Sequence, residues 1–247
     1  MTTPSAAYLE RPDRPALAYR HRAGTGPTIV FLPGYMSDMA GGKATAVLAD
    51  CAVRGQACLL LDYAGCGLSE GRFADQTLTD WRDDVVDLIG ALVPGPVVLV
   101  GSSLGGWLML LVALALEPER VAGLIGIAPA PDFTEWGFSD TEKAIIQTEG
   151  QLAEETPYSE QPYVTTRGFW ESGQANRLLG DPIRIACPVH LLHGQRDDDV
   201  PWEISLKLAA ALTSDDVRVT LIKDGDHRLS RDADIALLLT TLAGMGR

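Results

Sequence analysis

The sequence predicts an open α/β fold, with a mostly parallel central sheet covered by helices on both faces. Short apolar runs rich in Val, Ile and Leu recur along the 247 residues, as expected of strands that are buried on both faces. Amphipathic helical patterns separate most of these runs, and such alternation is typical of a parallel sheet. The chain is 46% hydrophobic and 21% charged, a composition that excludes a disordered or collagen-like chain.

Six apolar runs are predicted as strands of this sheet. They cover residues 28–32, 57–61, 97–100, 121–127, 189–192 and 217–222. Apolar residues recur every three or four positions in four other stretches, which predicts helices there. These helices cover 77–92, with Thr77 as the N-cap, then about 104–116, 204–212 and 235–242.

Residues 88–116 contain no charged side chain and are long enough to suggest a membrane span. Pro94-Gly95-Pro96 and the glycines around Ser103 interrupt this stretch, because both break a helix. We therefore predict a buried strand that leads into a buried helix.

Residues 131–181 interrupt the alternation and are predicted as a small helical cap, inserted into an α/β core formed by 1–130 and 182–247. The segment has no strand-like run, and aromatic side chains are concentrated there among acidic and polar residues. The aromatic residues are Phe133, Trp136, Phe138, Tyr158, Tyr163, Phe169 and Trp170. They fit either the core of an ordinary insertion or a lid whose rings face a substrate pocket.

The formal net charge of −13 disfavours nucleic acid and strongly anionic substrates, and it favours an apolar pocket. Four cysteines without C-x-x-C spacing indicate neither a disulfide framework nor a zinc site. Residues 1–14 mix acidic and basic side chains without an apolar stretch, so they resemble neither a signal peptide nor a transit peptide. We expect a cytoplasmic protein without a metal ion, a cofactor or stable membrane insertion.

Gly101-Ser102-Ser103-Leu104-Gly105 matches the G-x-S-x-G pattern of a nucleophile elbow, with Ser103 as the candidate nucleophile. The motif lies between a predicted strand and a predicted helix, a turn that presents the hydroxyl at a helix N-terminus. Glycines two residues before and after Ser103 remove side chains that would collide with neighbouring backbone. This context favours a nucleophile over a simple glycine-rich turn.

A serine nucleophile needs a base and an acid that orients the base, and candidates for both follow later strands. Asp197 comes just after the His-Gly turn that ends one strand, and His227 lies on the loop after the last strand. The order serine, acid, histidine is that of nucleophile-elbow enzymes. The alternatives are His193 as the base and Asp198, Asp199 or Asp132 as the acid.

The oxyanion of an acyl-transfer intermediate needs backbone N–H donors, and two residues are predicted to supply them. One is Leu104, directly after the nucleophile, and the other is Tyr35, in the loop after the first predicted strand. Gly34 would let this loop approach closely, although a plain Pro-Gly turn is the alternative.

From about residue 17 onward the chain resembles the α/β-hydrolase superfamily of serine hydrolases. The resemblance is carried by LPGYMS at 32–37, LDYAGCG at 61–67, GSSLGGWLM at 101–109, LHG at 192–194 with DD at 197–198 and VPW at 200–202, and DHR at 226–228. These segments are similar to a mitochondrial branch of the superfamily, with palmitoyl-protein thioesterase and mycophenolic acid acyl-glucuronide esterase activity. The resemblance implies an α/β-hydrolase fold and a triad of Ser103, Asp197 and His227.

We expect a serine hydrolase that cleaves carboxylic esters or acyl thioesters through an acyl-enzyme, with a small molecule or an acylated protein as substrate. The alternative is a non-catalytic small-molecule binder, since a fold does not settle function. A dinucleotide site at 65–71 is excluded, because Glu70 stands where the motif needs glycine. Arg196 and Arg228, beside two candidate triad residues, are candidates to bind a substrate carboxylate.

Overall fold

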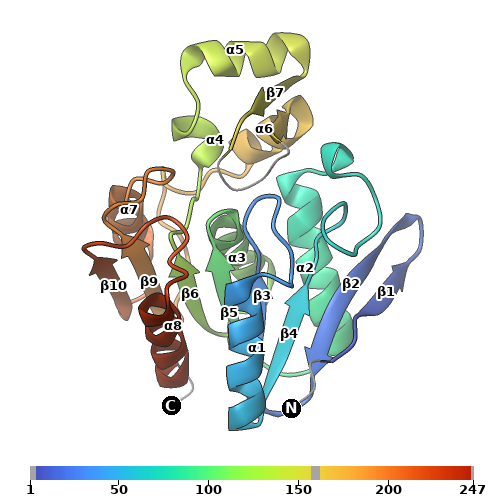
Figure 1. Cartoon of the computed structure of the whole chain (residues 1–247), viewed down its shortest axis with the longest axis vertical. Helices are drawn as coiled ribbons and strands as arrows, with labels where there is room; N and C mark the ends of the chain where they lie inside the picture. Colours follow the sequence, from blue (N-terminus) through green and yellow to red (C-terminus); the bar gives the residue numbers. More distant parts are fainter. Residues whose placement is uncertain (1–3, 157–161, 246–247) are drawn as a thin grey trace.

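The computed structural model describes residues 4–156 and 162–245. Its centre is an eight-stranded sheet in the order β1-β2-β4-β3-β5-β6-β9-β10 (Figure 1). The strands from β4 to β10 in this order run parallel to one another, while β1 and β2 are antiparallel to their neighbours. The predicted α/β class and mostly parallel sheet are confirmed.

Every predicted strand is present, and most are longer than the apolar run that indicated them. They are β3 (Thr25–Leu32), β4 (Gln56–Leu61), β5 (Val97–Ser102), β6 (Val121–Ile127), β9 (Val189–Gly194) and β10 (Val217–Ile222). The edge strands β1 (Ala7–Arg11) and β2 (Arg14–Arg22) were not predicted, because charged side chains interrupt their apolar pattern. Two of these, Arg11 and Arg14, form ion pairs with Asp84 in the helix beneath.

Helices cover both faces of the sheet. α1 (Gly42–Arg54) and α8 (Asp232–Gly244) pack on one face, and α2 (Leu78–Leu92), α3 (Leu104–Ala115) and α7 (Glu203–Ala211) pack on the other. Short 3₁₀ helices occur at η1 (Phe73–Asp75) and η2 (Pro118–Arg120). Thr77 caps α2 as predicted, whereas α1 was not predicted; its N-cap is Gly41, which offers no side-chain cap.

Residues 88–116 form the end of α2, β5 and α3. Within the described part of the chain, no helix has the length and apolar character that crossing a membrane requires.

The segment 131–181 lies between β6 and β9 and stands above the sheet at the top of Figure 1. It contains α4 (Phe133–Trp136), α5 (Asp140–Glu149), β7 (Gln151–Glu154), β8 (Tyr163–Thr166) and α6 (Arg167–Ala175). The antiparallel pair β7–β8 was not predicted, because each strand has four residues and β8 alone buries one of them. Tyr158 lies outside the described residues.

Candidate active site

Ser103 sits on a strained turn between β5 and α3. Its φ is +55° and its ψ −119°, a conformation that non-glycine residues adopt only where the surroundings impose it. Its N–H donates to the carbonyl of Ile127 (2.9 Å), and its carbonyl accepts from the N–H of Ala130 (3.1 Å). A Cβ on Gly101 would overlap the carbonyl group of Gly105, and a Cβ on Gly105 would overlap the carbonyl of Leu32, so neither flanking position has room for a side chain. The turn is therefore fixed from both sides.

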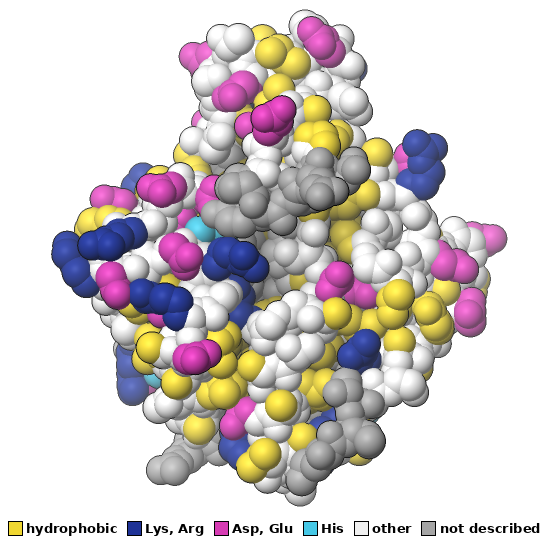
Figure 2. Space-filling model, viewed as in Figure 1, with side chains coloured by type: hydrophobic (Ala, Val, Ile, Leu, Met, Phe, Trp, Pro, Cys, Tyr) yellow, Lys and Arg dark blue, Asp and Glu magenta, His cyan; other side chains and the backbone are white. Residues whose placement is uncertain are grey.

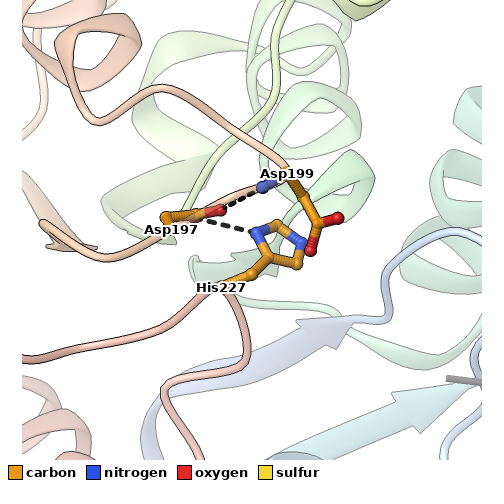
Figure 3. A group of neighbouring side chains, drawn as sticks. All are labelled: Asp197, Asp199 and His227. Carbon is orange, nitrogen blue, oxygen red and sulfur yellow. Dashed lines mark hydrogen bonds and ion pairs between the residues drawn. The ribbon is translucent and has the colours of Figure 1, made fainter. Parts of the chain in front are cut away.

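The structure brings Ser103, His227 and Asp197 together in one hydrogen-bonded series. The Oγ atom of Ser103 is 3.1 Å from Nε2 of His227. On the other side of the ring, Nδ1 of His227 is 2.9 Å from Oδ2 of Asp197, as Figure 3 shows. The three residues lie on loops that follow β5, β10 and β9. Because these strands are parallel, the loops meet at one edge of the sheet.

The Asp197 carboxylate is buried and receives four hydrogen bonds. Its Oδ1 accepts from the backbone N–H groups of Asp199 (3.0 Å) and Val200 (2.8 Å), and its Oδ2 lies 3.1 Å from Nε2 of His193 as well as near His227. Burial opposes ionisation, but the hydrogen bonds from His193 and His227 outweigh it and hold the pKa of Asp197 well below its usual range. The group is therefore a carboxylate at neutral pH.

The two candidate histidines have different partners. His227 contacts Ser103, whereas His193 is fully buried and contacts Asp197 from the other side. The sequence offered His193 as an alternative base and did not predict its contact with Asp197. The spacing of four residues to Asp197, across a Gly turn, was the available signal.

The other candidate acids, Asp198, Asp199 and Asp132, differ in location. Asp198 is exposed at the cavity, and Asp199 turns its side chain toward His227 (Figure 3). The carboxylate of Asp132 accepts the backbone N–H groups of Leu178 and Leu179, both at 2.8 Å. Asp132 therefore joins the two ends of the segment 131–181.

Asp197, Asp199 and His227 offer ligand atoms within 4.8 Å of one another, and among the described residues they form the group that could hold a metal ion (Figure 3). The Nδ1 atom of His227 must carry a hydrogen to bond the Asp197 carboxylate, whereas a metal ligand needs a bare nitrogen. A metal on Nδ1 would replace the hydrogen bond to Asp197, and a metal on Nε2 would replace the contact of that nitrogen with Oγ of Ser103.

The loop after β3 lies close to the serine. A Cβ on Gly34 would stand 3.3 Å from the carbonyl oxygen of Ser102 and 3.5 Å from Cβ of Ser103, so a side chain there would crowd the turn. Tyr35 follows in this loop, and Leu104 is the first residue of α3, where helix N–H groups lack partners within the helix. Both predicted donors are thus on segments that adjoin Ser103.

The Tyr35 side chain connects this loop to the segment 131–181. Its hydroxyl donates to the carbonyl of Val164 in β8 at 2.7 Å, and burial raises its pKa far above the usual value. Its ring contacts the rings of Phe73, Trp81, Phe133, Tyr163 and Phe169. Several of the predicted aromatic residues therefore pack on Tyr35 and on one another.

A cavity of about 610 Å³ opens beside Ser103 and His227, between the core and the segment 131–181. Phe133, Trp136 and Phe138 line it on one side, and Lys43 and Arg228 line it on another. Figure 2 shows a recess at this level with dark blue side chains at its border. Apolar and charged side chains therefore both line the cavity, and Arg196 is not among its lining residues.

Lys43 is held at the border of the cavity by its neighbours. Its Nζ donates to the carbonyl of Arg228 and to Oγ of Ser230. Burial and, next, the positive charge of Arg228 lower the pKa of Lys43 to about 8. Its charge therefore changes close to physiological pH.

Residues 29–237 match the model of the alpha/beta hydrolase family. The human palmitoyl-protein thioesterase ABHD10, mitochondrial, is 43% identical over 242 residues, which cover 96% of this chain and 79% of the human protein. The solved structure of alpha/beta hydrolase domain-containing protein 10 from mouse has a TM-score of 0.91 at 41% identity, over 98% of both chains. A crystal structure from Agrobacterium vitis S4 has a TM-score of 0.91 at 38% identity, again over 98% of both chains.

These relatives correct one prediction. The curated relatives from human, orangutan and mouse are named as mitochondrial proteins, which contradicts the expected cytoplasmic location. The mixed charges of residues 1–14 were therefore a poor guide to the compartment.

Proposed function

The chain belongs to the alpha/beta hydrolase family, and we propose that within it the protein is a serine hydrolase of carboxylic esters or acyl thioesters. The observation that carries this proposal is the hydrogen-bonded series from Ser103 through His227 to Asp197 beside an open cavity. In this proposal Ser103 is the nucleophile, His227 the general base and Asp197 the orienting acid.

The reaction follows from the positions of the hydrogen atoms. The Nδ1–H of His227 is donated to Asp197, which leaves Nε2 bare to accept the proton of Ser103 as its oxygen attacks the acyl carbonyl. The protonated ring then gives this proton to the leaving alcohol or thiol, and an acyl-enzyme remains. Water, activated by the same nitrogen, releases the acid and restores Ser103.

The backbone N–H groups of Leu104 and Tyr35 are the proposed oxyanion donors. The N-terminus of α3 adds the positive end of its dipole at the same point, which favours a developing negative charge.

The substrate class follows from the cavity and the relatives together. We assign residues 131–181 the role of a cap that selects the acyl group, on a core of 1–130 and 182–247, because its aromatic side chains line the cavity. The curated relatives are named palmitoyl-protein thioesterases, so acyl thioesters of small molecules or proteins are the first class to test.

A fluorophosphonate probe tests the nucleophile directly. We expect one label per wild-type chain and none on Ser103→Ala. We expect kcat on a matched series of oxoesters and thioesters to fall by about 10⁴ to 10⁶ in Ser103→Ala and His227→Ala. Ser37→Ala, a serine in the wall of the cavity, is the matched control and should keep its label. Stoichiometric labelling of Ser103→Ala would refute the assignment, and tight ligand binding without turnover would favour a non-catalytic binder.

A further inference from the structure

The side chain of His193, near the end of β9, makes hydrogen-bonding contacts that the pairing of this strand does not need. Its Nδ1 is 2.7 Å from Oγ of Ser205, and its Nε2 is 3.1 Å from Oδ2 of Asp197 and 3.0 Å from the carbonyl oxygen of Val200. The side chains of His193 and Asp197 are both fully buried. The histidine therefore lies behind the Asp197 carboxylate, on the side away from the cavity.

The partners of His193 decide where its hydrogen lies. A carbonyl oxygen only accepts hydrogen bonds, and the ionised Asp197 carboxylate does the same. The Nε2 atom faces both of these acceptors, so it carries a hydrogen whether the ring is neutral or charged. The opposite nitrogen then meets the Ser205 hydroxyl, which is able to donate or accept.

We propose that His193 is a positioning residue, which donates its Nε2–H to the same carboxylate oxygen that receives the Nδ1–H of His227. This inference rests on the proposed hydrolase function. The donated hydrogen bond fixes the orientation of Asp197 toward His227, together with the two backbone N–H groups on Oδ1. It also draws negative charge away from Oδ2, which limits how strongly Asp197 stabilises the positive charge that the His227 ring gains when its Nε2 takes the proton of Ser103.

Other charged groups line the cavity together with His227, and Asp199 lies close to it; none of them is changed in the experiment. They are Asp38 and Glu154, Asp198 and Asp199 on the loop after β9, Arg228 next to His227, and Lys43 on α1. A change in the pH profile of a His193 variant is assigned to the loss of the donor to Asp197.

Two substitutions of His193 by residues with amide side chains distinguish the contact made by Nδ1 from the contacts made by Nε2. In His193→Gln the terminal NH₂ reaches about as far as Nε2 and can donate to Asp197 and Val200. In His193→Asn the shorter amide reaches about as far as Nδ1, so it keeps the contact with Ser205 and loses the one with Asp197. Both variants are polar, so neither introduces an apolar group beside the buried carboxylate.

The assay is hydrolysis of a short-chain 4-nitrophenyl ester from pH 5 to pH 9. We expect kcat/KM of His193→Asn to fall about tenfold or more, by analogy with partners of ligating groups in metal sites, which are worth on the order of 10–100-fold. We expect its acid limb to move to higher pH, because the Asp197 carboxylate then stabilises the protonated His227 ring more strongly and the base must be neutral. His193→Gln should restore both the rate and the pH profile.

The ring ¹⁵N signals of the wild type give a second readout that needs neither activity nor a variant. We expect a protonated Nε2 on His193, and a bare Nε2 would overturn the proposal even if His193→Asn fails to fold. Equal rates and equal acid limbs in both variants and the wild type, with normal fluorophosphonate labelling, would overturn the role of His193 alone. A wild type that is neither labelled nor active would refute the proposed function instead.

Discussion

Different contacts stabilise two regions of the molecule: the edge of the sheet that carries Ser103, and the segment 131–181 above that edge. At the edge, the Asp197 side chain is fully buried with four hydrogen bonds, and the turn at Ser103 is fixed by backbone contacts on both sides. In the segment, Phe169 and its neighbouring rings are buried toward the core, but the outer elements are not: α5 buries one residue, Ile146, and β7 buries none. The comparison teaches that the proposed chemistry sits where buried hydrogen bonds hold the reacting groups, and the proposed selection of substrate on a segment whose outer elements are less buried.

A pair of glycine substitutions tests the rigidity of the two regions. A Cβ on Gly105 would overlap the carbonyl of Leu32, whereas a Cβ on Gly180 meets nothing within 4 Å. We expect Gly105→Ala to lower the free energy of unfolding by about 1–3 kcal/mol, and Gly180→Ala to change it by less than about 0.5 kcal/mol. Urea denaturation measures both. Equal losses would show that the two regions are equally constrained.

Trp136→Ala tests the assignment of selection to the segment. Trp136 lines the cavity from α4, so its removal should reduce the preference for long over short acyl chains by about tenfold. The turnover of a short ester should be unchanged, because no contact with Ser103 or His227 is lost. The readout is kcat/KM across a series of acyl lengths. Trp202→Ala, outside the cavity lining, is the control, and an equal effect there would refute the assignment.

Two tyrosines give a matched test of the link between the regions. The Tyr35 hydroxyl donates to Val164 in the segment, and the Tyr63 hydroxyl donates to Pro33 within the core. We expect Tyr35→Phe to cost about 0.5–1.5 kcal/mol and to speed hydrogen exchange in β8. Tyr63→Phe should leave exchange in β8 unchanged. Identical exchange in the two variants would mean that Tyr35 does not couple the segment to the core.

The pKa of Lys43, lowered to about 8 by burial and by Arg228, predicts a pH effect at the border between the two regions. Lys43 is charged below this pH and neutral above it. The KM of an ester with a carboxylate in its leaving group should therefore rise severalfold, by about 0.5–1 kcal/mol, from pH 7 to pH 9. A neutral ester should show no such rise, and Lys43→Gln should remove the difference. A rise that persists in Lys43→Gln would assign the effect to another group.

The sequence predicted the core well, because its strands are continuous apolar runs and the turn at Ser103 has a pattern of its own. The run at 121–127 and β6 coincide, and Thr77 caps α2 as expected. The edge strands β1 and β2 and the pair β7–β8 escaped prediction, because pairing with neighbours and not local pattern stabilises them.

Candidate site residues were found where chain order and spacing carry information. Ser103, Asp197 and His227 follow such an order, and the structure brings them together. The contact between His193 and Asp197 depends on ring orientation, and the place of Lys43 depends on a helix that the pattern did not predict. Neither could be derived from spacing alone.

The hydrogen bonds of the Asp132 carboxylate bear on how the inserted segment could be replaced during evolution. Its oxygens accept the backbone N–H groups of residues 178 and 179, so the 45 residues between positions 132 and 178 leave and re-enter the core at a single point. A loop closed in this way tolerates changes in length, since doubling its length costs only about 0.6 kcal/mol of closure entropy. The segment between positions 132 and 178 could therefore be replaced by a different one while Ser103, His227 and Asp197 keep their positions. Asp132 marks the junction at which such a replacement would change substrate specificity.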